Sequence, residues 1–214
     1  MLTIIMSKMP ESDIPKSAWG PGPWQDEPDR VEWNDERTGL ACRIIRNMMF
    51  GHLNGYVGVP PTHPYFGWGY GDNIKLAPGD LDEDTTIDDM GIFNTFIYAM
   101  QGAGERGTIP LGMTLKAHQG ITWSGELAGC SDMQTSGLWF FGFDCGHAWD
   151  VSPGLNRMMA PLIAELPIPD RKYRDLDYVR KEVTALAFQL RQLETRVLID
   201  DGVLTFAGNQ NRDR

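Results

Sequence analysis

Residues 138–143 read Leu-Trp-Phe-Phe-Gly-Phe, and residues 144–147 continue directly as Asp-Cys-Gly-His. An uninterrupted apolar run of this length is typical of a strand that is covered on both faces, as a central strand of a sheet is. The titratable side chains that follow at once are the first candidates for a functional site. This stretch therefore predicts both the middle of the fold and the place to look for chemistry.

Other segments supply further strands for the same sheet. Residues 39–46 and 56–59 are expected to pair as a β-hairpin, because a glycine-bounded turn at 51–55 separates them and prolines follow at 60–61. In residues 111–123 apolar and polar side chains alternate, which predicts a strand with one buried face and one polar face. Lys116, His118 and Thr122 share the polar side of that alternation.

The C-terminal region contains an apolar stripe at helical spacing. Its members lie alternately three and four residues apart, with charged residues outside the stripe, which predicts one long amphipathic helix. They are Leu176, Val179, Val183, Leu186, Leu190, Leu193 and Val197. Such a stripe fits packing across the sheet or a homodimer through the helix, and we expect packing on the sheet. The fold class is therefore α+β, a mostly antiparallel β-sheet with a long C-terminal amphipathic helix packed on one face.

Three parts of the chain are distinguished by composition. Residues 1–38 are rich in Trp and Pro and predict an extended N-terminal strap, because prolines prevent long helices and buried tryptophans would hold the segment to the body. Residues 39–200 are expected to form a single α+β domain, and residues 201–214 a flexible tail. Within the domain, 60–73 is a loop dense in Pro, Gly and aromatics, 80–89 an acidic loop, and 91–101 a short helix.

The 214-residue chain carries 19 Lys+Arg against 29 Asp+Glu, a formal net charge of −10. This acidic balance argues against duplex nucleic acid and anionic membranes as partners, since both attract basic surfaces. No run approaches the roughly 18–20 apolar residues that span a bilayer. Three cysteines, Cys42, Cys130 and Cys145, do not form a disulfide framework, so a cytoplasmic protein with reduced thiols is expected.

All four histidines lie in turns or at strand ends beside glycine or proline: His52, His63, His118 and His147. Imidazole titrates near neutral pH and ligates metals, so we expect these rings to gather at one accessible site. Three chemical interpretations remain open. Cys145 and His147 could form a nucleophile pair. Cys145, His147 and His118, with Cys130 or His63, could hold zinc, although the usual ligand spacings are absent.

The favoured interpretation needs no metal or other cofactor, with His118 and His147 serving as general acid/base or hydrogen-bond donors around a ligand. The alternative is a purely structural role, in which Asp144 and His147 form a buried polar network that fixes the loop. The candidate catalytic residues are His118, His147, Asp144 and Cys145. The candidate ligand-binding residues are Lys116, Thr122, His52, His63, Tyr56, Trp68, Arg43 and Arg46, of which an arginine fits a phosphate group.

Five segments resemble a family of uncharacterised bacteriophage and prophage proteins. They are residues 24–33, 51–60 with His63-Pro64, 118–123, 139–150 and 173–179, within a resemblance that spans about 19–193. The Gly-Phe-Asp-Cys-x-His segment is the most specific. The chain departs from the family at Asn54, Gln119 and Trp149, where the family pattern has cysteine, glycine and glycine, and Asn54 weakens any role for a thiol ligand there.

This resemblance implies a phage accessory gene product, acting in the host cell cytoplasm, and implies no particular activity. Small phage accessory proteins often counter host defence, and several bind or cleave nucleotide signals. By that association we expect an anti-defence protein that binds a small nucleotide-like molecule at the histidine site. If the protein is an enzyme, we expect it to hydrolyse that molecule. The alternatives are a nucleotide sponge or an inhibitor of a host protein without catalysis, and a zinc-dependent hydrolase.

Overall fold

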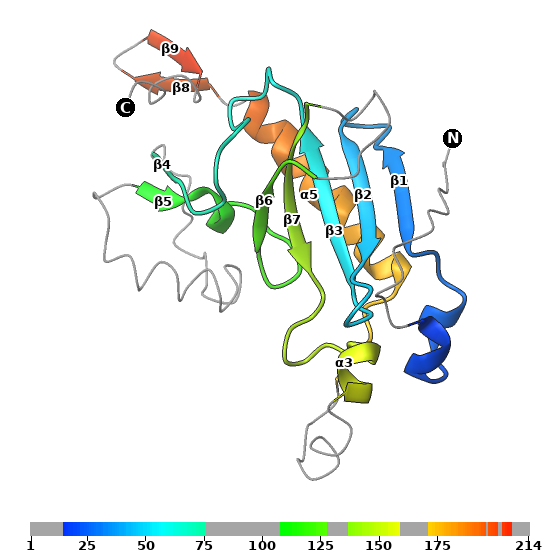
Figure 1. Cartoon of the computed structure of the whole chain (residues 1–214). Helices are drawn as coiled ribbons and strands as arrows, with labels where there is room; N and C mark the ends of the chain where they lie inside the picture. The colour runs from blue at the N-terminus through cyan, green and yellow to red at the C-terminus, as the bar shows by residue number, and fades with distance from the viewer. Residues whose placement is uncertain are drawn as a thin grey trace.

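A five-stranded antiparallel sheet forms the centre of the structure (Figure 1). The computed structural model describes residues 15–75, 108–127, 137–158 and 171–195, and the backbone of 197–200 and 203–206. The strand order is β1–β2–β3–β7–β6. The strands are β1 Arg30–Asn34, β2 Ala41–Arg46, β3 Leu53–Val59, β7 Trp139–Asp144 and β6 Trp123–Gly125. The hairpin of β2 and β3 and the position of β7 inside the sheet confirm the sequence predictions.

Helix α5, Leu176–Thr195, crosses one face of the sheet and packs on β2 and β3 (Figure 1). Its stripe residues Val179, Val183, Leu186 and Leu190 are completely buried. The close approach of helix and sheet needs a glycine at position 55, because a Cβ there would lie 2.6 Å from Val183 Cγ2. The predicted packing on the sheet and the α+β class are thus confirmed. The helix ends before Val197, which begins β8.

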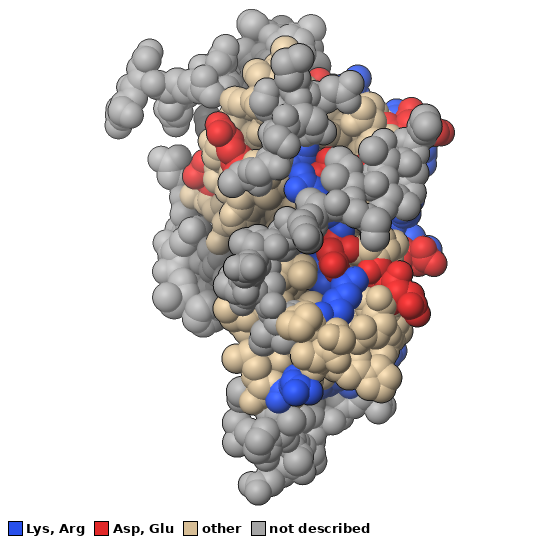
Figure 2. Space-filling model, turned by 45° about the vertical axis from the view of Figure 1, so that its right-hand side comes forward, with Lys and Arg blue, Asp and Glu red and all other residues tan. Residues whose placement is uncertain are grey.

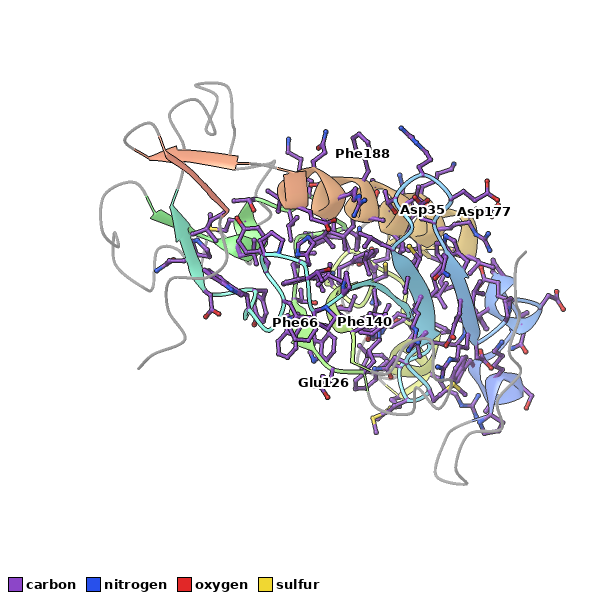
Figure 3. The ribbon with its side chains drawn as sticks, turned by 90° about the horizontal axis from the view of Figure 1, so that it is seen from above. Asp35, Phe66, Glu126, Phe140, Asp177 and Phe188 are labelled. Atoms are coloured by element: carbon purple, nitrogen blue, oxygen red, sulfur yellow. The ribbon has the colours of Figure 1, made fainter. Side chains whose placement is uncertain are left out.

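The two faces of the sheet carry different side chains. Phe141 and Phe143 of β7 join the core cluster that contains the α5 stripe. Phe140 lies on the opposite side of the sheet, as does Phe66, whereas Phe188 lies on the outer side of α5 (Figure 3). Because β7 is covered on both faces, its sequence shows no alternation.

The predicted strand over 111–123 is wrong. Residues Leu111–Met113 form a 3-10 helix, η3, and the chain then turns until β6 begins at Trp123. Gln119 and Gly120 have φ values of 59° and 95°, which an extended strand does not allow. Leu111, Leu115 and Ile121 are nevertheless buried. The alternation in the sequence therefore does not correspond to the two faces of a strand, since His118 and Gly120 on its polar side are buried as well.

Short elements complete the described structure. They are η1 Lys16–Trp19, η2 Pro23–Gln25, β4 Asn73–Lys75 paired with β5 Thr108–Pro110, α3 Pro153–Met158, and β8 Val197–Asp200 paired with β9 Val203–Phe206. Edge strand β1 falls within the segment expected to be a strap, and β9 within the segment expected to be a tail. The acidic run 80–89 and the helix expected over 91–101 lie outside the described residues. No described helix is long and apolar enough to cross a membrane.

Buried Arg46 links the N-terminal segment, the sheet and the start of α5. Its guanidinium donates to Glu27 Oε2 and Asp29 Oδ1, both at 2.8 Å, and to the Gly51 carbonyl at 2.9 Å. Glu27 in turn accepts the backbone N–H of Leu176, the first residue of α5. Acidic and basic side chains also lie next to one another on the molecular surface drawn in Figure 2.

We predict that Arg46→Met lowers the free energy of unfolding by about 3–5 kcal/mol, because it leaves the Glu27 carboxylate buried without its counter-charge. Urea unfolding followed by circular dichroism measures the change. The matched control is Arg191→Met, which removes a half-exposed partner of Glu194 and should cost less than about 1 kcal/mol. Equal losses in the two variants would contradict the assigned role of Arg46.

Candidate functional site

The segment after β7 folds into a tight turn that places His147 and Asp150 side by side. The Asp150 N–H donates to the His147 carbonyl at 2.9 Å, and the His147 N–H donates to Asp150 Oδ2 at 3.2 Å. Asp150 is completely buried. A parallel bridge to Lys172 and a hydrogen bond from Arg171 Nε to the Asp150 carbonyl hold the turn against the segment before α5.

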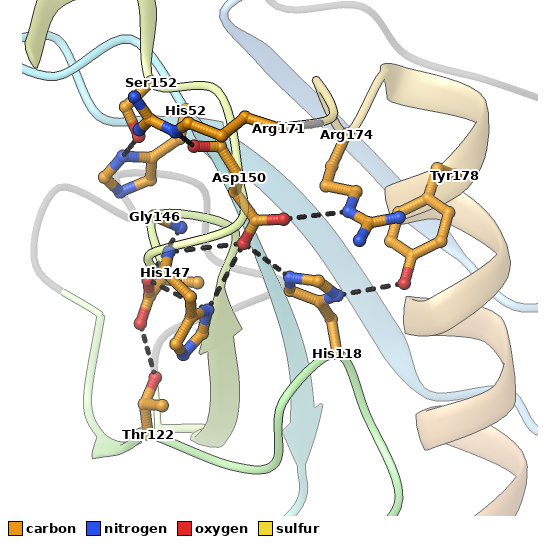
Figure 4. Close-up of polar contacts among 11 residues, drawn as sticks. His52, His118, Thr122, Gly146, His147, Asp150, Ser152, Arg171, Arg174 and Tyr178 are labelled. Atoms are coloured by element: carbon orange, nitrogen blue, oxygen red, sulfur yellow. Dashed lines mark hydrogen bonds and ion pairs between the residues drawn. The ribbon is translucent and has the colours of Figure 1, made fainter. Parts of the chain in front are cut away.

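The carboxylate of Asp150 is where three separate parts of the chain meet (Figure 4). His118, from the loop before β6, places Nε2 at 2.7 Å from Asp150 Oδ2. Arg174, just before α5, donates through Nε to Asp150 Oδ1 at 2.9 Å. Burial by itself raises a carboxyl pKa, but contacts with His118, His147 and Arg174 hold the pKa of Asp150 well below its usual value. Asp150 is therefore an ionised carboxylate inside the protein.

His118 is buried, and both of its ring nitrogens have partners. Nε2 faces Asp150, and Nδ1 lies 2.9 Å from the hydroxyl oxygen of Tyr178 on the first turn of α5. The Tyr178 ring meets the His118 ring edge to face, and the Arg174 guanidinium lies over the Tyr178 ring at 4.8 Å. Because an ionised carboxylate only accepts hydrogen bonds, Nε2 carries a hydrogen in this arrangement.

His147 is the more accessible of the two imidazoles, with about one-fifth of its side chain exposed (21%). Its Nδ1 is nevertheless buried and has no hydrogen-bond partner within the described part of the chain. Carboxylate oxygens of Asp150 and Asp144 lie 3.5 and 3.9 Å from that nitrogen. Burial lowers the pKa of His147, but these two carboxylates outweigh it and leave the pKa above its ordinary value.

Together these residues bring three potential metal ligands to one point. His118 Nε2, His147 Nδ1 and a carboxylate oxygen of Asp150 all lie within 4.8 Å of one another. Ligand bonds of about 2.0–2.2 Å hold neighbouring ligand atoms roughly 3–3.5 Å apart. The observed separations of 2.7 and 3.5 Å from Asp150 Oδ2 to the two nitrogens lie close to that range. We call these three residues the His–Asp cluster.

Asp144 lies beside the His–Asp cluster and more than one-third of its side chain is exposed (37%). Its Oδ2 accepts a hydrogen bond from Thr122 Oγ1 at 3.0 Å, and its Oδ1 accepts the Gly146 N–H at 2.9 Å. These contacts fix the carboxylate at the end of β7. The structure thus brings together four of the sequence-predicted residues: His118, His147, Asp144 and Thr122.

The other two histidines have different surroundings. His52 is buried behind the 145–152 turn, where Nδ1 lies 3.2 Å from Ser152 Oγ and the ring occupies the space that a Cβ at Gly146 would need. His63 Nε2 lies 3.0 Å from the Leu190 carbonyl, twelve residues along α5 from Tyr178, or about 18 Å of helix. Burial lowers the pKa of both. The expectation that all four imidazoles share one site therefore fails for His63.

The remaining predicted ligand-binding residues have other contacts. Backbone groups of Lys116 bond to the Gln189 side chain, and the Trp68 carbonyl accepts from Trp139. Tyr56 packs edge to face on Trp123. Buried Arg43 lies near Glu32 and over the Phe140 ring, and Arg46 forms the contacts described above. None of these contacts is with the His–Asp cluster.

Cys145 does not fit the role of nucleophile. Its side chain is buried in the core cluster beneath the turn, and burial together with the charges of Asp150 and Asp144 raises the pKa of the thiol well above its usual value. Cys42 is also buried, which with the charge of Asp35 raises its pKa to about 12. Both thiols are therefore protonated and inaccessible. Cys130, an alternative zinc ligand, lies outside the described residues.

Sequence reasoning missed Asp150, Tyr178 and Arg174. The sequence does contain a signal for Asp150. An aspartate three residues after His147 suits a tight turn in which both side chains lie on the same side. Tyr178 lies on the first turn of α5, and Arg174 lies two residues before that helix begins. Tyr178 contacts His118, which is 60 residues away in the sequence, and Arg174 contacts Asp150, which is 24 residues away. Both contacts depend on the tertiary fold.

No protein-family model, no curated protein and no solved structure matches the chain. The geometry of the site is therefore the basis for inferring its function.

We predict that neither Cys42 nor Cys145 reacts with Ellman's reagent in the native protein, because both thiols are buried. The reaction should be at least about 1000-fold slower than that of a free thiol, since it requires opening of the fold. The measurement uses a Cys130→Ser variant, with the same protein in guanidinium chloride as the control in which both thiols react. One rapidly reacting native thiol would show that Cys145 is accessible after all.

Proposed function

We propose that the protein binds a divalent transition-metal ion at the His–Asp cluster and is a metal-dependent hydrolase of a small, nucleotide-like molecule. The observation that carries the metal site is the convergence of His118 Nε2, His147 Nδ1 and an Asp150 oxygen within 4.8 Å. The nucleotide-like substrate and the role against host defence come from the general association of small phage accessory proteins with host defence, since the family resemblance itself implies no activity.

The Nδ1 atom of His147, which lies near two carboxylates without a hydrogen bond to any described residue, supports a metal ion in particular. Buried polar atoms are normally hydrogen-bonded, and leaving one unpaired costs about 1–3 kcal/mol. Nδ1 of His147 is buried without such a partner, yet it faces the carboxylate that His118 also contacts. A cation between these three groups would be coordinated by the nitrogen and would balance the negative charge of Asp150.

The ligand set indicates the class of metal. Two imidazoles and one carboxylate suit Zn²⁺, Co²⁺ or Fe²⁺ better than Mg²⁺ or Ca²⁺, which prefer oxygen ligands. Three protein ligands are also the usual number in catalytic zinc sites, where a further position is left for water or substrate. When bound, such an ion lowers the pKa of a coordinated water and polarises a phosphoryl oxygen.

The neighbouring residues have defined tasks in such a reaction. Asp144 is exposed, is fixed by Thr122 and Gly146, and lies 3.9 Å from the His147 ligand nitrogen, so it is placed to accept a proton from an attacking water. Arg174 and Tyr178 hold Asp150 and His118 from behind. In this proposal the two imidazoles are metal ligands and not a metal-free acid/base pair, because both converge on the carboxylate of Asp150.

We predict that untagged protein contains about one equivalent of zinc or a related metal, and that His147→Ala loses the metal. Elemental analysis after gel filtration measures this content. Because a metal-dependent reaction needs the same ligand, hydrolysis of a panel of cyclic and ADP-ribose nucleotides should fall by more than about 100-fold in that variant. His147 is partly exposed, so the variant should remain folded.

Asp177→Asn is the matched control, since it removes an exposed carboxylate of α5 that has no part in the site. It should keep both metal and activity. Metal that persists in His147→Ala, or that is lost equally from both variants, would contradict the metal site. Stoichiometric metal without hydrolysis of any nucleotide would contradict the substrate class and leave the metal site in place.

A second candidate is a binding module without catalysis. Asp150 already accepts hydrogen bonds from His118, Arg174 and the His147 backbone, and this closed network orders the 144–152 segment without any ion. An ordered loop of this kind suits sequestration of a nucleotide. Heating the protein after incubation with nucleotides distinguishes the candidates, because sequestration returns the ligand intact and hydrolysis returns it altered.

A further inference from the structure

Among the residues that the structure describes, the Tyr178 hydroxyl is the group that contacts His118 Nδ1, the ring nitrogen that faces away from Asp150. This hydroxyl lies 2.9 Å from Nδ1, whereas Nε2 on the other edge of the ring faces Asp150. The two rings are nearly perpendicular, at 88°, with centroids 5.5 Å apart. Tyr178 belongs to α5. The Arg174 guanidinium lies over the Tyr178 ring and also donates a hydrogen bond to Asp150.

Metal ligation changes what this hydroxyl must do. Without metal, the Nε2 hydrogen of His118 faces Asp150, so a neutral ring has Nδ1 as an acceptor and the Tyr178 hydroxyl donates to it. A ring that ligates through Nε2 must carry its hydrogen on Nδ1, and the Tyr178 oxygen must then accept it. A tyrosine hydroxyl serves both arrangements because it can donate and accept.

We infer that Tyr178 is the positioning residue of the site, and that its hydroxyl orients His118 so that Nε2 is the nitrogen presented to a metal ion. This inference rests on the proposed metal site and adds a specific partner on α5. It predicts that metal affinity depends on one hydroxyl group that does not contact the ion. Outer hydrogen bonds of this kind typically change metal affinity 10–100-fold.

The test compares the zinc affinity of wild type, Tyr178→Phe and Tyr173→Phe at one fixed pH, by competition with a chromophoric chelator. Tyr173 is the matched control, because its hydroxyl also makes buried hydrogen bonds, to Arg46 and Glu27, but none to the His–Asp cluster. Tyr178→Phe should bind zinc about 10–100-fold more weakly, and Tyr173→Phe within about 2-fold of wild type. Unfolding curves of the zinc-free proteins report any loss of the fold separately.

A second measurement needs no substitution. Long-range ¹H–¹⁵N spectra of ¹⁵N-histidine-labelled wild type show which ring nitrogen of His118 carries hydrogen. In the zinc-loaded protein we expect the hydrogen on Nδ1 and zinc on Nε2. Zinc on Nδ1, or unchanged affinity in Tyr178→Phe, would overturn the role of Tyr178 while leaving a metal site. No zinc binding by wild type would overturn the metal site and this inference together.

Discussion

A completely buried carboxylate is the constraint on which this structure depends. Removing an ionised group from water costs several kcal/mol unless charges and hydrogen-bond donors replace the lost hydration. Asp150 meets that requirement by recruiting His118, Arg174 and the backbone of His147. Because His118 and Arg174 come from segments distant from the turn that carries Asp150 and His147, satisfying one side chain fixes the loop before β6, the turn after β7 and the start of α5 relative to one another.

The fold and the site therefore share the same contacts. Helix α5 covers the sheet with its apolar stripe, and its first turn also supplies Tyr178, which contacts His118. Strand β7 lies inside the sheet between β3 and β6, and it ends at Asp144, directly before the turn that carries His147. A site built in this way is preorganised, since its side chains are held before any ligand arrives.

Much of the fold could be predicted from the sequence, because its strongest patterns reflect burial. The apolar run of β7 and the spacing of Val179, Val183 and Leu186 predict the sheet and the helix that covers it. The alternation in 111–123 misled, because these residues form a 3-10 helix and a loop in which Lys116 is exposed but His118 and Gly120, on the same side of the alternation, are buried. For the site, His118 and His147 were predicted, whereas their pairing through Asp150 depends on contacts between segments that no local pattern contains.

X-ray absorption spectroscopy at the zinc edge of the zinc-loaded protein tests the central claim most directly. A His–Asp cluster predicts a four- or five-coordinate ion with two imidazoles and one carboxylate, at about 2.0–2.2 Å. The two imidazoles give outer-shell scattering that oxygen ligands lack. A six-coordinate spectrum of oxygen ligands alone, without imidazole scattering, would contradict the proposed centre.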